Sequence, residues 1–257
     1  MALALVTGAS AGIGRSFAEA LARRGYDLIL VARSTARIEA LGHELSDRHK
    51  VRVNAWTADL ASDAGREDVA ARIAALPQLD LLVNNAGFAT TGKLAKIPVE
   101  SQTDMLRLHA LAPMRLTAAA LPRMIEHRAG GIINVSSIAS FLYGPGNVNY
   151  SATKAYLTSF SLGLDTEVRS AGVRVQALCP GFTHTEIHAN MPHVKQQIPW
   201  WLWGSADRVV ETSLRQLAAG GPVICIPGMR NKLMRWVLTL IPHALRRRLA
   251  VRRKKRS

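Results

Sequence analysis

Short runs of apolar residues alternate with longer stretches of helical period along this chain. Seven runs are rich in Val, Ile and Leu and mostly lack strict alternation; they lie at 2–7, 27–33, 51–57, 79–84, 131–136, 173–179 and 223–226. Such runs are typical of strands that are buried on both faces. Between them, apolar side chains recur every three or four residues, which predicts helices. Examples are Ile13, Phe17 and Leu21, and then Ile38, Leu41 and Leu45.

The order of these elements predicts the fold class. Regular alternation of strand and helix is typical of a parallel sheet with helices on both faces. Right-handed crossovers make such a sheet doubly wound. We therefore predict an α/β protein with a single Rossmann domain and a seven-stranded parallel sheet in the order 3-2-1-4-5-6-7. We assign the domain to residues 1–228, with a substrate lid at 186–204, and a C-terminal extension to residues 229–257.

The chain is strongly basic, but its charge is unevenly distributed. The 33 Lys and Arg against 18 Asp and Glu give a formal net charge of +15. Eleven of the basic residues and none of the acidic ones lie in residues 229–257. The remaining 228 residues are nearly balanced, so the high isoelectric point describes the tail and not a basic domain.

Other features exclude several classes of protein. The two cysteines, Cys179 and Cys225, both lie in apolar runs and are interpreted as small buried hydrophobic residues, with no disulfide framework and no metal site. The N-terminus enters a strand at once and shows no signal peptide. No apolar run reaches the ~18 residues of a membrane-spanning helix. We therefore expect a cytoplasmic protein.

A glycine-rich turn follows the first apolar run and opens the first helical stretch. It reads Thr7-Gly8-Ala9-Ser10-Ala11-Gly12-Ile13-Gly14. Glycines at such a turn let the backbone approach a pyrophosphate, and the helix N-terminus supplies free N–H groups and a positive dipole end. The spacing is GxxxGxG and not the GxGxxG of many dehydrogenases. The alternative is a glycine-rich turn that binds no ligand.

Four further motifs follow the glycine turn in sequence order. Asp59 stands in Ala58-Asp59-Leu60, Asn84-Asn85-Ala86-Gly87 closes the fourth run, Tyr150 and Lys154 form a YxxxK pattern, and Pro180-Gly181 follows the sixth run. With these motifs the chain resembles the short-chain dehydrogenase/reductase family from residue 2 to about residue 228. The C-terminal segment is more loosely similar to members that resemble ketoacyl-CoA reductases. The resemblance implies an enzyme that moves hydride between a nicotinamide cofactor and a carbonyl or secondary alcohol.

The end of the second run bears on the choice of cofactor. NAD-binding sheets usually place a carboxylate there to hold the ribose 2′-hydroxyl, but this run ends in Ala32-Arg33-Ser34. The planar guanidinium of Arg33 could bind a 2′-phosphate, so we predict NADP(H); the alternative for Arg33 is a solvated loop arginine. The resemblance implies that the following residues bind the cofactor: Gly8, Ser10, Gly12, Ile13, Gly14, Arg33, Asp59, Leu60, Asn85, Ala86, Gly87, Tyr150, Lys154, Pro180, Gly181, Thr183 and Thr185.

Tyr150 and Lys154 lie four residues apart and therefore share one face of a helix. The resemblance implies that Tyr150 is the acid or base of the reaction. A nearby ammonium stabilises a phenolate and lowers the pKa of tyrosine from its reference value of ~10, so Tyr150 can exchange a proton with the substrate oxygen. Ser137 holds the place of the family's catalytic serine, which would orient that oxygen and stabilise its charge. Ser136, on the opposite face of the strand, is the alternative.

One position departs from the family pattern. Many members carry an asparagine in the helix after the fourth strand, which is thought to hold a water in a proton relay to the lysine. The matching residue here is His109. Histidine can donate and accept hydrogen bonds, so His109 could hold the same water, or fill the space and shift the relay, or be a partly buried helical residue. We count it as a candidate catalytic residue beside Ser137, Tyr150 and Lys154.

Two C-terminal segments bear on the substrate and the partners. Residues 186–204 contain Trp200, Trp201 and Trp203, which could line an apolar pocket, form part of a lid, or pack against the core. From Leu233 to Ile241, apolar residues spaced three and four apart precede a run of basic residues. That pattern is typical of a peripheral membrane anchor, and also of a helix that covers the core or a subunit interface. No nucleic-acid recognition fold accompanies the charge, so we expect no nucleic-acid partner.

The predicted function is an NADP(H)-dependent oxidoreductase that interconverts an alcohol and a carbonyl, which we take to be a lipophilic ketone, aldehyde or 3-oxoacyl compound. The alternative is a non-catalytic NADP(H)-binding protein that acts through its basic tail at a membrane or partner surface. His109 favours that alternative, and the intact set of Ser137, Tyr150 and Lys154 argues against it. The family also implies a homodimer or homotetramer, formed through helices near residues 98–126 and 150–170.

Overall fold

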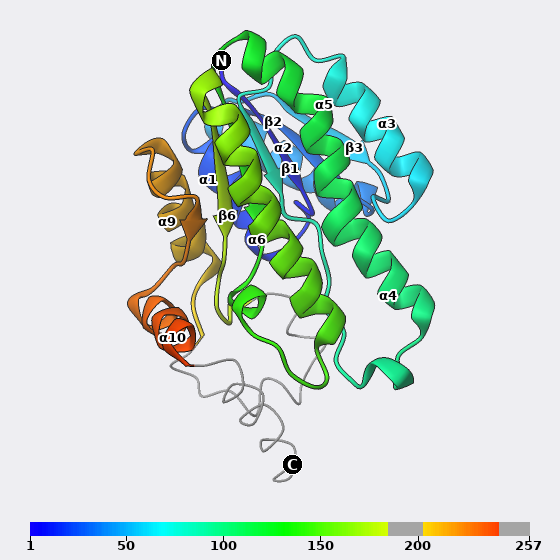
Figure 1. Ribbon diagram of the computed structural model, residues 1–257. Helices are drawn as coiled ribbons and strands as arrows, with labels where there is room; N and C mark the ends of the chain where they lie inside the picture. Colours follow the sequence, from blue (N-terminus) through cyan, green and yellow to red (C-terminus); the bar gives the residue numbers. More distant parts are fainter. Residues whose placement is uncertain (185–202, 242–257) are drawn as a thin grey trace.

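A parallel sheet runs through the centre of the molecule. The computed structural model describes residues 1–184 and 203–241, and within them seven parallel strands form one sheet in the order β3-β2-β1-β4-β5-β6-β7. The predicted fold class and strand order are therefore confirmed (Figure 1). The strands are β1 (Leu3–Thr7), β2 (Asp27–Ala32), β3 (Val53–Thr57), β4 (Leu81–Asn84), β5 (Gly130–Val135), β6 (Val173–Leu178) and β7 (Ile224–Cys225).

Helices cover both faces of the sheet (Figure 1). Helices α1, α2 and α9 lie on one face, and α3, α5 and α6 lie on the other. The longer helices are α1 (Gly12–Ala22), α2 (Thr35–His49), α3 (Asp63–Ala74), α4 (Val99–Leu106), α5 (Ala112–Glu126), α6 (Val148–Val168), α9 (Ala206–Ala218) and α10 (Met229–Leu240). The short helical turns are η1 (Leu94–Lys96), η2 (Arg107–Leu111), η3 (Ile138–Phe141) and η4 (Arg169–Ala171).

Two apolar cores, one on each face, explain why the strands lack strict alternation. Successive side chains of a strand point to opposite faces, so Leu5 packs under α5 and α6 while Val6 packs under α1 and α9. The helical period contributes the other half of each core. Phe17 and Leu21 of α1 are fully or almost fully buried in the same cluster as Val6.

Strand β3 departs from the expectation of strands buried on both faces. It lies at the edge of the sheet and pairs only with β2. Asn54 and Thr57 are consequently exposed, and none of its five residues is buried. Trp56 is covered by the guanidinium of Arg72, which lies 3.9 Å from the ring centre. The predicted strand order already places this strand at the edge, where a strand needs one apolar face at most.

No helix in residues 1–184 and 203–241 is both long enough and apolar enough to cross a bilayer. The same residues contain no group of three or more His, Cys, Asp or Glu side chains placed to hold a metal ion. The candidate functional residues lie at the carboxyl edge of the sheet, where the loops after β1, β4, β5 and β6 meet.

Candidate active site

The turn after β1 and the loop after β4 are joined by a set of short hydrogen bonds. The Thr7 hydroxyl accepts from the backbone N–H groups of Asn85 (2.9 Å) and Ala86 (3.0 Å) and donates to the Val83 carbonyl. The Asn85 side-chain amide donates back to the carbonyls of Thr7 (2.9 Å) and Gly8 (3.2 Å). Two motifs separated by almost eighty residues in the sequence therefore form one rigid unit.

Glycine is required where this unit meets helix α1. Gly8 has a φ of +64°, which favours glycine. A Cβ at Gly14 would lie 2.2 Å from the Gly8 carbonyl oxygen and 2.5 Å from the Asn85 amide nitrogen. No side chain caps the N-terminus of α1, and its first turn holds no acidic residue. Its backbone N–H groups and dipole are thus available to an anionic ligand such as a pyrophosphate.

The ends of β2 and β3 supply the side chains next to this anion site. Arg33 is exposed directly after β2, where no carboxylate is present. Asp59 is also exposed, and its carboxylate accepts from the backbone N–H of Ala61 (3.0 Å). The neighbouring Ser10 is half-buried in the glycine turn. Arg33 thus offers a cation at the tip of β2, where NAD-binding sheets usually place a carboxylate.

Tyr150, Ser137 and Lys154 meet at the start of α6. Ser137 follows β5 and hydrogen-bonds with the Tyr150 hydroxyl, and its oxygen also accepts from the backbone N–H of Ala139 (3.1 Å). The Lys154 Nζ lies 5.6 Å from the Tyr150 ring centre and donates to the Val135 carbonyl (2.9 Å). The three residues predicted from the sequence thus lie together, on α6 and at the end of β5.

Burial has the largest effect on the protonation of these groups. It lowers the pKa of the Lys154 ammonium to about 8, because a buried cation loses its hydration. It raises the pKa of the half-buried Tyr150, and the hydrogen bond from Ser137 acts in the opposite direction. From the sequence we expected Lys154 to lower the pKa of Tyr150. In the structure its Nζ donates to the Val135 carbonyl of β5. Lowering of the Tyr150 pKa by Lys154 therefore stays a prediction.

Ser136 and Ser137 have different surroundings. The buried Ser136 hydroxyl donates to the Lys154 carbonyl (2.7 Å) and lies 2.9 Å from the Thr158 hydroxyl. It therefore ties β5 to the middle of α6, whereas Ser137 is half-buried and bonds with Tyr150. Strand alternation accounts for the difference.

His109 is fully buried within the π-helical turn η2 and connects the loop after β4 to helix α6. Its Nε2 accepts from the backbone N–H of Phe88 (3.1 Å), which assigns the ring proton to Nδ1. Nδ1 lies 3.0 Å from the Thr153 hydroxyl, which in turn donates to the Tyr150 carbonyl (2.9 Å). Both ring nitrogens are occupied by protein partners, so neither is left to hold a water.

The environment of His109 keeps the ring neutral. Burial, and then the positive charge of Lys154, hold the pKa of His109 well below the ordinary value of 6.5. The ring packs edge-on against Tyr150, with the centres 5.8 Å apart. A Cβ at Gly87 would lie 2.7 Å from its Nε2, so the glycine leaves the space that the imidazole fills. The Gly87 of the loop motif is thus matched to the histidine.

A buried polar network beneath the site did not emerge from the sequence. The Asn84 amide donates to Asn134 on β5 (2.8 Å) and to Thr117 on α5 (3.2 Å). Asn134 donates to Ser161 on α6 (2.9 Å). Polar residues inside the apolar runs at β4 and β5 were the available signal, because a buried polar group needs a partner.

The loop after β6 completes the site. Pro180 accepts from the backbone N–H of Ile138, and the buried Thr183 hydroxyl donates to the Gly181 carbonyl (3.0 Å). Trp203 stacks on His184, with ring centres 5.0 Å apart. Of the predicted residues, Thr185 and the tryptophans Trp200 and Trp201 lie outside the described residues.

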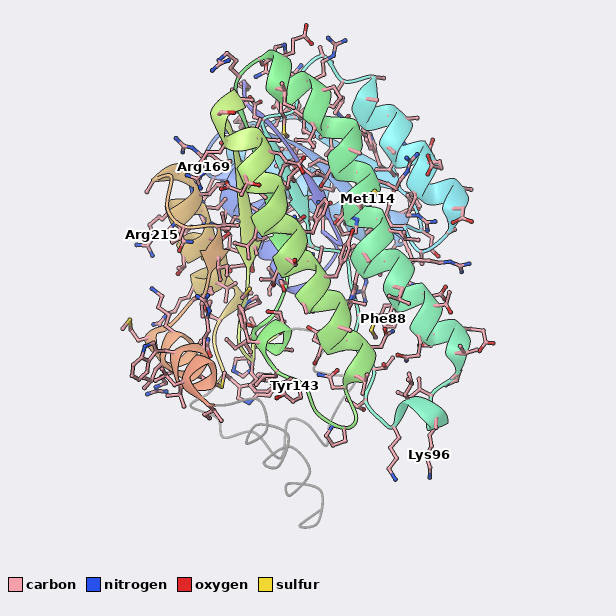
Figure 2. The ribbon with its side chains drawn as sticks, in the orientation of Figure 1. Phe88, Lys96, Met114, Tyr143, Arg169 and Arg215 are labelled. Carbon is pink, nitrogen blue, oxygen red and sulfur yellow. The ribbon has the colours of Figure 1, made fainter. Side chains whose placement is uncertain are left out.

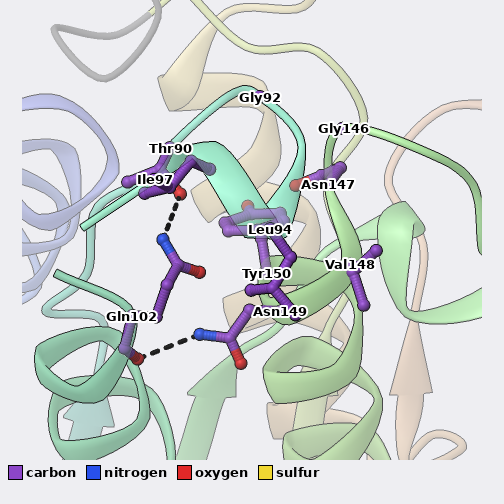
Figure 3. A pocket seen from close by; sticks show the side chains of 10 residues that line it. All are labelled: Thr90, Gly92, Leu94, Ile97, Gln102, Gly146, Asn147, Val148, Asn149 and Tyr150. Atoms are coloured by element: carbon purple, nitrogen blue, oxygen red, sulfur yellow. Dashed lines mark hydrogen bonds between the residues drawn. The ribbon is translucent and has the colours of Figure 1, made fainter. Parts of the chain in front are cut away.

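A small pocket opens directly beside Tyr150 (Figure 3). It lies between two loops, at residues 90–97 and 146–150, and Gln102 forms part of its wall. Gln102 donates to the Thr90 hydroxyl (3.1 Å), and the Asn149 amide donates to the Gln102 carbonyl (2.9 Å). The pocket measures about 10 Å³, which is room for about one water molecule, and Tyr150 is the member of the Tyr150, Ser137 and Lys154 cluster that lines it.

Comparison with known proteins agrees with this geometry. Residues 2–196 match the family model described as short chain dehydrogenase. The 3-oxoacyl-(acyl-carrier-protein) reductase of Aquifex aeolicus is 32% identical over 218 residues, which cover 82% of this chain and 88% of that protein. The very-long-chain 3-oxoacyl-CoA reductase of Bos taurus is 31% identical over 218 residues, which cover 83% of this chain and 68% of that protein.

Two solved structures share the fold over almost the full length of both chains. A short-chain dehydrogenase from Sphingobium yanoikuyae in complex with NADPH has a TM-score of 0.84 and 32% identity, and covers 95% of this chain and 97% of its own. A bulky-bulky ketone specific alcohol dehydrogenase from Comamonas testosteroni has a TM-score of 0.80 and 28% identity, and covers 95% and 96%. The expected resemblance and the NADP(H) expectation agree with these neighbours.

Replacing Gly14 with alanine should abolish tight nucleotide binding. The new Cβ would lie 2.2 Å from the Gly8 carbonyl oxygen, so the glycine turn would have to move apart from helix α1 and open the anion site. We expect at least a tenfold weaker NADPH affinity in a fluorescence titration. Gly163→Ala is the matched control, because nothing lies within 4 Å of its added Cβ on helix α6. Equal affinities for the two variants would contradict this account of the turn.

His109 should make the folded state sensitive to acid. Because its pKa is held well below 6.5 in the folded chain, the unfolded chain binds this proton first as the pH falls. The contribution is fully present above pH ~6.5 and is lost below it, by about 1.4 kcal/mol for each pH unit until the folded pKa is reached. Thermal unfolding at pH ~7.5 and ~5.5 should therefore show a larger loss for the wild type than for His109→Asn. Parallel losses would show that the ring is not held neutral.

Proposed function

We propose a specific reaction for this chain, which belongs to the short-chain dehydrogenase family and is an oxidoreductase. The proposed reaction is NADP(H)-dependent reduction of a lipophilic 3-oxoacyl compound or bulky ketone to the alcohol, and its reverse. The observation that carries it is the meeting of Tyr150 and Ser137 beside the buried Lys154.

The residues present fit a dinucleotide. The uncapped N-terminus of α1 and the space kept open by Gly14 suit a pyrophosphate, and the loop at Asn85 and Ala86 borders that space. When bound, the reduced nicotinamide supplies the hydride. The protein supplies the orientation and the proton.

Tyr150 is the proposed proton donor to the substrate oxygen. Its hydroxyl is hydrogen-bonded with Ser137. In our proposal Ser137 donates to the same oxygen and stabilises the negative charge that develops there. Lys154, with a pKa of about 8, is largely protonated at neutral pH and supplies the positive charge that favours transfer of the Tyr150 proton.

NADP(H) is favoured over NAD(H) by the charge at the end of β2. Arg33 is exposed there, and no carboxylate occupies the tip of the strand. A guanidinium can bind a 2′-phosphate with two parallel hydrogen bonds. The half-buried Ser10 stands in the adjacent turn.

The relatives and an aromatic pair after β6 support a lipophilic substrate. The relatives include reductases of 3-oxoacyl and very-long-chain 3-oxoacyl groups, and one structural neighbour is named for bulky ketones. In this chain Phe182 and Trp203 pack together after β6, with ring centres 5.8 Å apart. Large aromatic side chains at this edge suit an apolar acyl or ring system.

His109 is proposed as a positioning residue and not as a proton relay. Its two hydrogen bonds fix Phe88, just after the loop motif, relative to Thr153, one helical turn from the start of α6. Those two segments carry the proposed nicotinamide contacts and the catalytic tyrosine. A neutral ring can do this next to Lys154 without adding a second buried cation.

Two expectations about partners stay proposals. Exposed apolar side chains on α4 and α6, including Leu106 and Leu162, suit a homo-oligomer built through these helices. The basic C-terminal extension suits a peripheral contact with a membrane.

Tyr150→Phe should lose turnover and keep the cofactor. Removal of one general acid typically costs about 10²–10⁴ in rate, while the ring still packs against His109. NADPH consumption with a 3-oxoacyl thioester and with a bulky ketone measures the rate, and fluorescence titration measures binding. Tyr156→Phe is the control, because that ring is 40% exposed on the same helix. Full turnover by Tyr150→Phe would refute the assignment.

Arg33→Glu should reverse the cofactor preference. A carboxylate repels a 2′-phosphate and accepts from a 2′-hydroxyl, so we expect at least a tenfold loss in NADPH affinity with NADH affinity equal or improved. Lys50→Glu makes the same change of charge at the far end of α2, where it should leave both affinities unchanged. If Arg33→Glu affects both cofactors equally, Arg33 does not contact the 2′-phosphate.

A further inference from the structure

Helix α10 packs on the domain through its polar side. The Asn231 amide donates to the Pro227 carbonyl (2.7 Å). The Arg235 guanidinium lies over the ring of Phe141 in η3, 5.0 Å from its centre. Met234 is the apolar member of this contact and packs against the cluster that includes Ile138 and Cys179.

The opposite side of α10 is apolar and exposed. Leu233, Trp236 and Leu240 are each 60% or more exposed. Met229 and Val237 extend the same surface. A surface helix normally buries its apolar stripe and exposes its polar residues, and α10 does the reverse. A cluster of exposed large apolar side chains of this kind marks an interaction surface.

The apolar surface continues around the mouth of the active site. Residues 142–148 follow η3, and this segment is held to the loop at 90–97 by a hydrogen bond from the Gly92 N–H to the Gly146 carbonyl (3.0 Å). Exposed large apolar residues follow this path: Leu142, Tyr143, Val148 and Leu94. Tyr143 and Lys96 lie at the same end of the molecule as α10 (Figures 1 and 2). We call this surface, from α10 through residues 142–148 to η1, the rim.

The rim is also basic. Its segments at 88–100, 138–148 and 228–241 hold one acidic residue, Glu100, and five basic ones: Lys93, Lys96, Arg230, Lys232 and Arg235. Residues 242–257 add eight Lys and Arg and no acid to the sequence that follows. Apolar side chains mixed with an excess of cations are the combination that binds the surface of an anionic bilayer. A two-fold contact with a second copy would set these cations against each other.

We propose that the rim docks on an anionic lipid bilayer, with the exposed face of α10 buried at the level of the headgroups. Helix α10 also contacts the loop after β6, because Asn231 lies 2.6 Å from the place of a Cβ at Gly181. Docking therefore turns the mouth of the site toward the lipid. Docking itself is independent of the proposed reaction; the entry of a lipophilic substrate from the bilayer rests on it.

The test uses the full chain and vesicles of phosphatidylcholine, with and without phosphatidylserine. The wild type should sediment with the phosphatidylserine vesicles, and this binding should weaken as salt is raised, because exposed charges are screened. Leu233→Glu/Leu240→Glu should bind at least tenfold more weakly. Ala40→Glu/Ala71→Glu makes the same charge change at two exposed residues of α2 and α3, outside the rim and outside the helices proposed for the oligomer, and should bind like the wild type.

Several outcomes would overturn the proposal. One is that the wild type binds neither kind of vesicle. Another is that the two double variants lose vesicle binding equally. A third is that the α10 variant binds fully and that binding is lost only when residues 242–257 are removed. A fourth is a smaller particle in light scattering for the α10 variant with unchanged vesicle binding, which would assign the face to a second copy. NADPH-dependent reduction of the 3-oxoacyl thioester and of the bulky ketone is measured on every variant in the absence of vesicles. Normal turnover by a wild type that binds no vesicles would refute the docking alone. Vesicle binding by a wild type without turnover would refute the proposed reaction alone.

Discussion

The Thr7 hydroxyl sets the geometry on which the site depends. It accepts two backbone N–H groups from the loop after β4 while β1 and β4 pair as neighbours in the sheet. The loop is held from its other side by His109, which accepts from the N–H of Phe88. The segment from Asn85 to Phe88 is thus fixed at both ends, between the glycine turn and helix α6. Preorganisation of this kind lets a binding site act without reordering its backbone.

Charge explains why a histidine suits the second of these attachments. Lys154 is buried beside Tyr150, with only 5% of its surface exposed, and a second buried cation there would be strongly unfavourable. The imidazole of His109 can donate and accept while it stays neutral, and the nearby ammonium itself helps to keep it so. A neutral ring with both nitrogens occupied fixes the positions of the groups around Tyr150, and leaves the positive charge to the lysine alone.

The sequence was sufficient for the fold and for the identity of the central residues, because both depend on local patterns. Runs buried on both faces identified the strands, and the family resemblance named Tyr150 and Ser137, which the structure places in hydrogen-bonding contact. The predicted strand order put β3 at the edge of the sheet, but its run was interpreted as buried on both faces, and the exposure of Asn54 and Thr57 was not predicted. The network of Asn84, Asn134 and Ser161 was missed because its bonds join three elements, and no local spacing encodes them.

The orientation of α10 shows the same limit from the other side. Its apolar spacing predicts an amphipathic helix equally well with that face inward or outward. Contacts decide the orientation: Asn231 and Arg235 bind the domain, so Leu233 and Leu240 must face away from it. Because the polar residues of α10 make its intramolecular contacts, its apolar face is exposed and open to another partner. Helix α10 contacts η3, and the loop that follows η3 leads to Tyr150, so in our proposal the partner and the substrate approach this enzyme from the same end.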